Sequence, residues 1–196
     1  MAFITLWTIG LGMLAERAAR RRGVFLRAAS TCWLAMVLLA VLAVAASWVK
    51  VTLAVALVAI AFAAVTDAQS GFIFDPLVIA GTIGSVVAAA LAGEGVSSLY
   101  GAAAAAGAVF CIWALTQGRG IGFGDVKVAA VIGAGFGPLD GLSAVGLSFI
   151  IGSAIATARM FVGKARFGTS VRFGPYLLAG SVCLLAYHRL NDGVLR

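Results

Sequence analysis

Residues 51–66 read VTLAVALVAIAFAAVT, a run without one charged side chain, and the residue that ends it is Asp67. A helix needs ~20 apolar residues to cross the hydrocarbon of a bilayer, and this run of 16 comes close to that length, so it predicts a membrane-embedded helix. The rest of the chain has the same character, since 63% of its 196 residues are hydrophobic and only 11% are charged. This composition excludes a water-soluble globular domain, a disordered tail and a coiled coil.

Charged residues divide the sequence into about eight apolar runs, and each run predicts a helix. Because several runs are shorter than ~20 residues, we expect six to eight membrane crossings. The predicted fold is an all-α, polytopic transmembrane helical bundle. The runs are Met1–Ala15, Ala28–Val49, Val51–Thr66, Pro76–Gly93, Ser97–Gln117, Val126–Gly137, Gly141–Val162 and Gly174–Tyr187.

The basic residues predict how the bundle is oriented. Cytoplasmic connections are enriched in Lys and Arg, so the arginine cluster in 17–27 places that connection inside and the N-terminus outside. Counted alternately from there, the cytoplasmic connections are 17–27, 67–75, 118–127 and 164–172, and the C-terminus is also outside. The net charge of +7 is spread over these connections instead of forming a phosphate-binding surface, so we expect no nucleic-acid partner.

Small residues recur at helical spacing in three pairs, Gly81 with Ser85, Gly101 with Ala105, and Gly133 with Gly137. Such faces let helices approach closely in lipid, where the hydrophobic effect does not drive helix association. Helix packing therefore accounts for nearly all the glycines outside the loops.

Two of the seven acidic residues stand out by position. Asp67 directly follows one apolar run and Asp125 directly precedes another, both on the predicted cytoplasmic side. An aspartate costs about 2.5–3.5 kcal/mol at the centre of a membrane helix and less near its end, and acids kept close to lipid are commonly functional. Two carboxyls at one site share a proton, because like charges raise one pKa.

Such a pair suits peptide hydrolysis. The ionised member takes a proton from water, while the protonated member binds the scissile carbonyl and helps the amine to leave. Spacing alone leaves open which aspartate is the base, since the two titrations belong to the pair.

Glycines precede the second aspartate, because residues 118–127 read GRGIGFGDVK. Glycine backbone permits close approach, and a protease at the membrane must hold its substrate extended, for example as an added strand. Gly122 and Gly124 are therefore candidates for substrate binding. An anion-binding turn or a plain helix start are the alternatives for such a loop.

Three motifs together resemble those of the type IV prepilin peptidases, a family of membrane aspartic proteases. Residues 122–125, Gly-Phe-Gly-Asp, look like the GxGD signature of that family, with its trailing lysine at Lys127. Asp67 is in keeping with the first family aspartate, and residues 173–175 resemble the Phe-Gly-Pro motif that opens a later helix. The resemblance implies that Asp67 and Asp125 are catalytic and that no metal or organic cofactor is needed.

The resemblance also implies a substrate and a location. We expect an endopeptidase of the bacterial plasma (inner) membrane that removes basic leaders from type IV prepilins or pseudopilins at the cytoplasmic face. Its partners would be the prepilin and the lipid bilayer. Residues 1–196 would form one domain, with N-terminal spans in 1–50 and a catalytic core in 51–188. The connection 16–29 has no cysteine pair, so the sequence resembles the short form without the methyltransferase insertion.

Three positions depart from the family pattern. Phe74 stands where proline is expected, Asp75 where asparagine is expected, and Arg172 replaces a common proline. We expect Asp75 to be a solvated loop residue, with an effect on the aspartate pair or a contact to a basic leader as the alternatives.

Three other functions remain open from the sequence, and one of them is a catalytically inactive assembly factor of the same fold, although both acids are present. A small transporter could use the same aspartates to bind a proton or a cation, and it would show flux without cleavage. A related protease could cut helices within the bilayer, although such relatives usually carry a Tyr-Asp pair where this chain has Thr66-Asp67.

Overall fold

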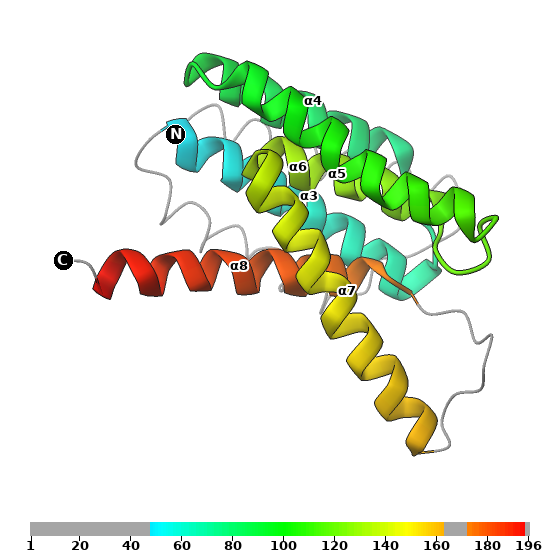
Figure 1. Ribbon diagram of the computed structural model, residues 1–196. Helices are drawn as coiled ribbons and strands as arrows, with labels where there is room; N and C mark the ends of the chain where they lie inside the picture. The colour runs from blue at the N-terminus through cyan, green and yellow to red at the C-terminus, as the bar shows by residue number, and fades with distance from the viewer. Residues whose placement is uncertain (1–47, 163–171, 195–196) are drawn as a thin grey trace.

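A computed structural model describes residues 48–162 and 172–194, which fold into helices joined by short connections (Figure 1). No strand occurs in these two ranges, so the all-α prediction is confirmed for them. Each of the last six predicted runs coincides with one helix, while the runs before residue 48 lie outside the described residues. The helices are α3 (Trp48–Ser70), α4 (Asp75–Leu91), α5 (Gly95–Leu115), α6 (Phe123–Phe136), α7 (Pro138–Phe161) and α8 (Gly174–Val194).

Three described stretches are long and apolar enough to cross a membrane: Val51–Ser70, Gly95–Leu115 and Pro138–Phe161. Helix α4 is a shorter apolar helix of 17 residues. Helix α6 has 14 residues and is therefore only ~21 Å long, less than the ~30 Å of bilayer hydrocarbon. The structure thus supports a membrane protein, while the number of eight crossings and the outer location of both termini stay predictions.

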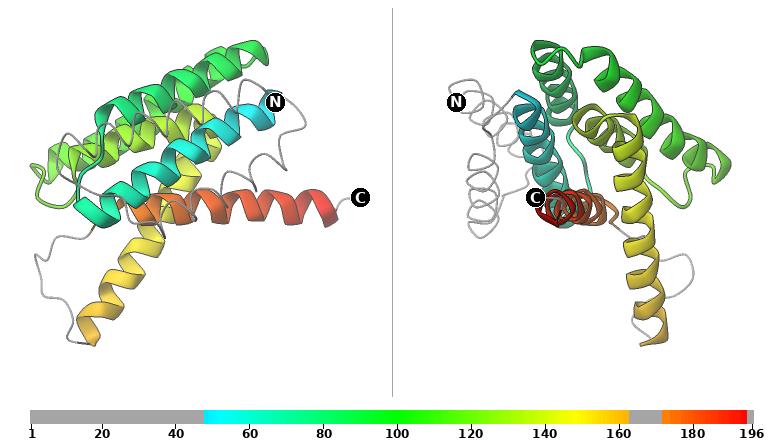
Figure 2. Two further views of the ribbon diagram at one scale, coloured as in Figure 1. Left: turned by 180° about the vertical axis from the view of Figure 1, so that it is seen from behind. Right: turned by 60° about the vertical axis from the view of Figure 1, so that its left-hand side comes forward.

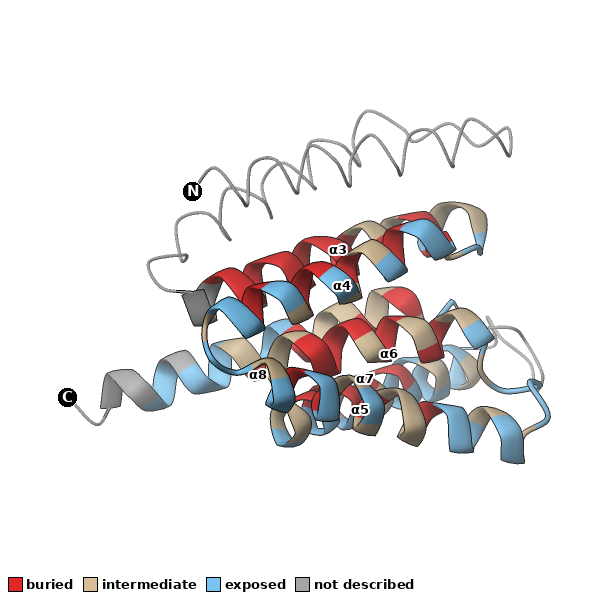
Figure 3. Ribbon diagram, turned by 90° about the horizontal axis from the view of Figure 1, so that it is seen from above, coloured by how far each residue is buried: buried red, intermediate tan, exposed pale blue. Residues whose placement is uncertain are grey.

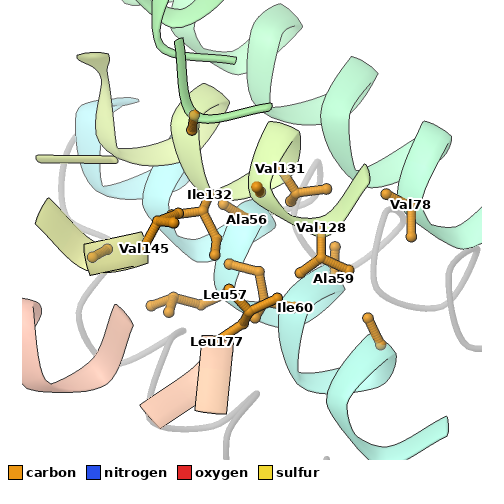
Figure 4. Packing of buried hydrophobic residues seen from close by; sticks show 14 of the residues in the cluster. Ala56, Leu57, Ala59, Ile60, Val78, Val128, Val131, Ile132, Val145 and Leu177 are labelled. Carbon is orange, nitrogen blue, oxygen red and sulfur yellow. The ribbon is translucent and has the colours of Figure 1, made fainter. Parts of the chain in front are cut away.

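Helix α3 is the most enclosed element, and it packs against α4, α6 and α8. In its apolar stretch 78% of the residues are buried, against 22% for α5 and 28% for α7. Figure 3 shows this difference as a nearly continuous buried surface along α3. The fully buried side chains Ile60, Ile132 and Leu177 join α3, α6 and α8 in the core (Figure 4). Helices α5 and α7 therefore have the largest faces available to lipid.

Helix α7 crosses α8 steeply, and its C-terminal end stands away from the other described helices (Figures 1 and 2). The large apolar side chains Ile150, Ile155 and Phe161 are exposed along this end. In a membrane such a surface faces lipid or another hydrophobic segment.

Glycines allow α5, α6 and α7 to touch backbone to backbone. A Cβ atom built on Gly101 would lie 2.2 Å from the carbonyl oxygen of Gly133, and one built on Gly141 would lie 2.8 Å from the Cα of Gly133. At a second crossing, a Cβ on Gly81 would lie 2.4 Å from the Cβ of Ala59. Real Cβ atoms do not approach so closely, so the predicted role of these small residues in helix packing is confirmed.

The antiparallel order of the helices gathers one set of ends on one side of the bundle. The end of α3 and the starts of α4, α6 and α8 lie on the side that the sequence predicts to be cytoplasmic. On the opposite side, His188 Nε2 near the end of α8 lies 3.4 Å from Asp140 Oδ1 at the start of α7. The helix ends that carry the predicted site residues therefore lie on the same side of the bundle.

Candidate active site

Asp67 lies in the last turn of α3, whereas the sequence placed it in a connection from 67 to 75. Polar side chains near this end bond to carbonyls of the preceding turn: Thr66 Oγ1 donates to the Ala63 carbonyl at 3.0 Å, and Ser70 Oγ donates to the Thr66 carbonyl at 2.7 Å. Gly71 then ends the helix with a φ of 69° and donates its N–H to the Asp67 carbonyl at 2.8 Å. This is a glycine C-terminal cap. The Asp67 side chain is buried.

A distant glycine holds the carboxylate of Asp67. Gly174, the first residue of α8, donates its N–H to Asp67 Oδ2 at 2.9 Å. A Cβ atom on Gly174 would lie 2.9 Å from both Cβ and Oδ2 of Asp67, so only glycine fits there. The N-terminus of a helix also carries a partial positive charge, which favours a carboxylate. Sequence reasoning flagged the Gly-Pro pair at the start of α8 but missed this contact.

The preceding aromatic residue fixes the start of α8 against α7. The ring of Phe173 packs on that of Phe149, with centroids 4.7 Å apart. A Cβ on Gly152 would lie 2.9 Å from the Phe173 ring, so this glycine opens the space that the ring fills. The segment 173–175 thus joins α7, α8 and the end of α3. These contacts explain why an aromatic residue and then a glycine stand at the start of α8.

Arg172 brings a positive charge to the same place. Its guanidinium Nη1 donates to the carbonyl oxygen of Ala68, in the last turn of α3. Its charge also attracts the carboxylate of Asp67. The sequence identified Arg172 only as a departure from a family pattern, because nothing in its spacing connects it to a residue 105 positions earlier.

Asp125 lies in the first turn of α6, whereas the sequence placed it in the connection 118–127. Gly122 precedes the helix with extended backbone, φ −74° and ψ 147°. It donates its N–H to Asp125 Oδ2 at 3.1 Å, and its carbonyl accepts the Asp125 N–H at 3.1 Å. An acid at this position binds orphan N–H groups of the helix start, which is why the helix begins earlier than the apolar run. The Asp125 side chain is buried.

The structure brings the two aspartates near enough for their charges to interact. Asp125 lies outside the three candidate spans, and burial, together with the nearby charge of Asp67, raises its pKa from 3.8 to about 7. The N–H of Gly122 opposes this rise only in part. One carboxyl of the pair therefore retains a proton near neutral pH, as the shared-proton hypothesis requires. Within residues 48–162 and 172–194, no three His, Cys, Asp or Glu side chains form a group that could hold a metal ion.

The glycines before Asp125 differ in their surroundings. Gly122 is exposed, and its N–H is directed to Asp125. Gly124 is half-buried, and a Cβ on it would lie 3.0 Å from the Cδ1 of Ile73 in the α3–α4 connection. Close packing thus accounts for Gly124 in the described structure, and a role of Gly122 and Gly124 in substrate binding stays a prediction.

A third acid lies at the edge of the site. Asp75 is the first residue of α4, not a loop residue, and its Oδ1 lies 2.5 Å from Lys127 Nζ. The same ammonium group lies 5.2 Å from the ring centroid of Phe123. The pair links the start of α4 to the first turn of α6. The positive charge of Lys127 therefore neutralises the carboxylate of Asp75 and is not available to Asp125 alone.

A family model described as "Type IV leader peptidase family" matches residues 53–157, just over half of the chain, and this segment contains both Asp67 and Asp125. No solved structure matches the chain.

Curated relatives agree with the family model. A protein named prepilin leader peptidase/N-methyltransferase from Stutzerimonas stutzeri is 40% identical over 83 residues, which are 39% of this chain and 27% of that protein. Its namesake from Burkholderia pseudomallei (strain 1026b) is 30% identical over 136 residues, 62% of this chain and 41% of that protein. The Escherichia coli (strain K12) protein of the same name is 32% identical over 96 residues, 46% of this chain and 41% of that protein. The matched part of the chain thus spans 27–41% of the length of these relatives.

Proposed function

The chain belongs to the type IV leader peptidase family, and from that membership we propose that it is an aspartic endopeptidase of the bacterial plasma (inner) membrane. In this proposal it cleaves basic leader peptides from type IV prepilins or pseudopilins at the cytoplasmic face. The observation that carries the proposal is the burial of two acids, Asp67 at the end of α3 and Asp125 at the start of α6, near enough for their charges to interact. The proposal is confined to the peptidase step, because the family match covers the segment that contains both aspartates.

The chemistry needs one ionised and one protonated carboxyl. The ionised carboxylate takes a proton from water as the water oxygen bonds to the scissile carbonyl carbon, and the protonated carboxyl gives its proton to the carbonyl oxygen. In the resulting diol, the C–N bond breaks as the nitrogen receives the proton held by the first carboxyl. A hydroxyl proton then returns to the second carboxylate. The products are one amine and one carboxylic acid, and both aspartates regain their starting states.

The position of the pair suits a substrate that is half in the membrane. The apolar helix of a prepilin would lie among the spans, and its basic leader would stay in the cytoplasm. The cut would then fall at the membrane boundary, where α3 ends and α6 begins. We propose residues 51–188 as the catalytic core, Gly122 and Gly124 as support for the substrate backbone, and six to eight crossings with both termini outside.

A cleavage assay tests this proposal. The full chain, in detergent or in vesicles, is given a peptide with a basic leader followed by an apolar helix. Because asparagine cannot hold the shared proton, Asp67→Asn and Asp125→Asn should each lower cleavage by roughly 10³-fold or more. Asp140→Asn, on the opposite side of the bundle, is the matched control and should cleave normally. Undiminished cleavage by either site variant would remove the two-acid mechanism, and ion flux without cleavage would favour a transporter.

A further inference from the structure

The two aspartates of the pair have different electrostatic surroundings. Asp67 accepts the N–H of Gly174 at the start of α8, and it lies within reach of the positive charge of Arg172. The N-terminal end of a helix and a guanidinium both stabilise a negative charge. Arg172 is held in place because its Nη1 also donates to the carbonyl oxygen of Ala68, one residue after Asp67.

Among the residues that the structure describes, Asp125 has no comparable cation of its own. It accepts one N–H, from Gly122, and the charge that acts on it from α3 is the like charge of Asp67. On its own helix, Lys127 is bound to Asp75 of α4.

The other described helices packed around α6 do not supply Asp125 with a cation. Helix α5 carries no acidic or basic side chain from residue 95 to 115. Helix α7 carries Asp140 in its first turn and Arg159 in its last. Among the described side chains of α8, His188 lies 14 residues from Gly174, which is ~21 Å along the helix, and it contacts Asp140.

From this difference we propose that Arg172 is a positioning residue that fixes the shared proton on Asp125 and keeps Asp67 ionised. This rests on the proposed function, and it assigns the roles that the sequence left open. Asp67 is the base that takes a proton from the attacking water, and Asp125 is the acid that gives its proton to the scissile carbonyl oxygen. Arg172 itself does not touch the reacting atoms.

The pH profile of kcat separates these roles. If Asp67 is the base, its protonation causes the loss of activity at low pH, and the ionisation of Asp125 causes the loss at high pH. Removing the cation makes a charge on Asp67 less favourable. The low-pH limb of Arg172→Ala should therefore move upward by about one pH unit, so that cleavage below the optimum falls about tenfold.

Two further variants separate the charge of Arg172 from its hydrogen bond to Ala68. Arg172→Gln removes the charge but keeps an N–H donor, and it should shift the low-pH limb as Arg172→Ala does. Arg172→Lys keeps the charge and should retain the profile of the original chain. Arg119→Ala, which removes an exposed cation from the α5–α6 connection on the same side, is the matched control and should leave both limbs in place.

The outcomes are distinct. A low-pH limb that stays unmoved in both Arg172→Ala and Arg172→Gln would overturn the inference, and so would an equal shift in Arg119→Ala. A shift confined to the high-pH limb would reverse the roles, because Arg172 would then act on the acid and not on the base. Failure of the proposed function looks different: the original chain would not cleave, or Asp67→Asn and Asp125→Asn would cleave normally.

Discussion

Replacing Gly174 by alanine tests whether the start of α8 holds the site together. The added Cβ would lie 2.9 Å from both Cβ and Oδ2 of Asp67 and 3.3 Å from the Cα of Ala64. The Oδ2 atom ends the Asp67 side chain, but the Asp67 Cβ and the Ala64 Cα cannot move without the backbone of α3, so α8 must move away from α3. Forcing a methyl group into packed structure costs about 1–3 kcal/mol. The shift would also lengthen the 2.9 Å hydrogen bond to Asp67, and a hydrogen bond to a charged group contributes about 1.5–3 kcal/mol.

We therefore expect Gly174→Ala to destabilise the chain by about 1–3 kcal/mol. It should also lower kcat for leader cleavage by about 10- to 100-fold, because a displacement of ~1 Å at a catalytic group costs roughly that much. Thermal unfolding in detergent and single-turnover cleavage measure the two effects.

Gly107→Ala is the matched control, since a Cβ there would meet nothing within 4 Å in the described structure. Because alanine favours a helix over glycine by about 0.5–1 kcal/mol, this variant should be slightly more stable than the original chain. If Gly174→Ala behaves like Gly107→Ala in both measurements, the close approach of α8 to Asp67 is wrong.

Three further predictions follow from the described contacts. Because folding raises the pKa of Asp125 from 3.8 to about 7, the free energy of unfolding should fall as pH rises from about 4 to 7. In urea titrations at several pH values, Asp125→Asn should make the free energy of unfolding depend less steeply on pH. An equally steep pH dependence in Asp125→Asn would contradict this prediction. Gly133→Ala should destabilise the α5–α6 crossing by at least about 1–3 kcal/mol in thermal unfolding, whereas Gly146→Ala, where a Cβ has open space, should not. Exchanging the charges in an Asp75→Lys, Lys127→Asp variant should recover the stability lost in each single variant, which for a partly exposed pair is about 0.2–1 kcal/mol; a double variant no more stable than the singles would show that the pair contributes nothing.

The apolar runs predicted the existence and order of the described helices, but they misplaced the ends that carry the site. Runs were ended at charged residues, so Asp67 and Asp125 fell into connections. In the structure both acids are helical, because each has a specific partner for its carboxylate. Periodicity and hydrophobicity contain no information about such partners, so a charge at the end of a run is a poor marker of the end of a helix.

Helix length shows a second limit of the sequence. The run 126–137 is one of the runs too short for a full crossing, and α6 is also short, with 14 residues. Its side chains nevertheless belong to the core, since Val128, Val131 and Ile132 are almost fully buried. Hydropathy does not distinguish a helix that faces lipid from one enclosed by other helices. Burial of α6 follows from its packing against α3 and α4 as well as from its glycine contacts with α5 and α7, and the small-residue pattern indicated only some of these contacts.

Each of the two glycine motifs provides an N–H that binds the carboxylate of one aspartate, but one contact is local and the other is long-range. In 122–125, Gly122 donates its N–H to the carboxylate of Asp125, three residues later, so this contact is local. A glycine followed by an acid at a helix start can therefore indicate such a contact in the sequence. In 173–175, Gly174 binds Asp67 across 107 residues, and only the packing of α8 on α3 creates the contact. Within the described ranges, Asp125 has the like charge of Asp67 nearby and no cation beside it. Asp67 instead has the helix start of α8 and the positive charge of Arg172. The asymmetry of the pair, and with it the proposed assignment of base and acid, therefore follows from tertiary structure and is absent from the spacing of the motifs.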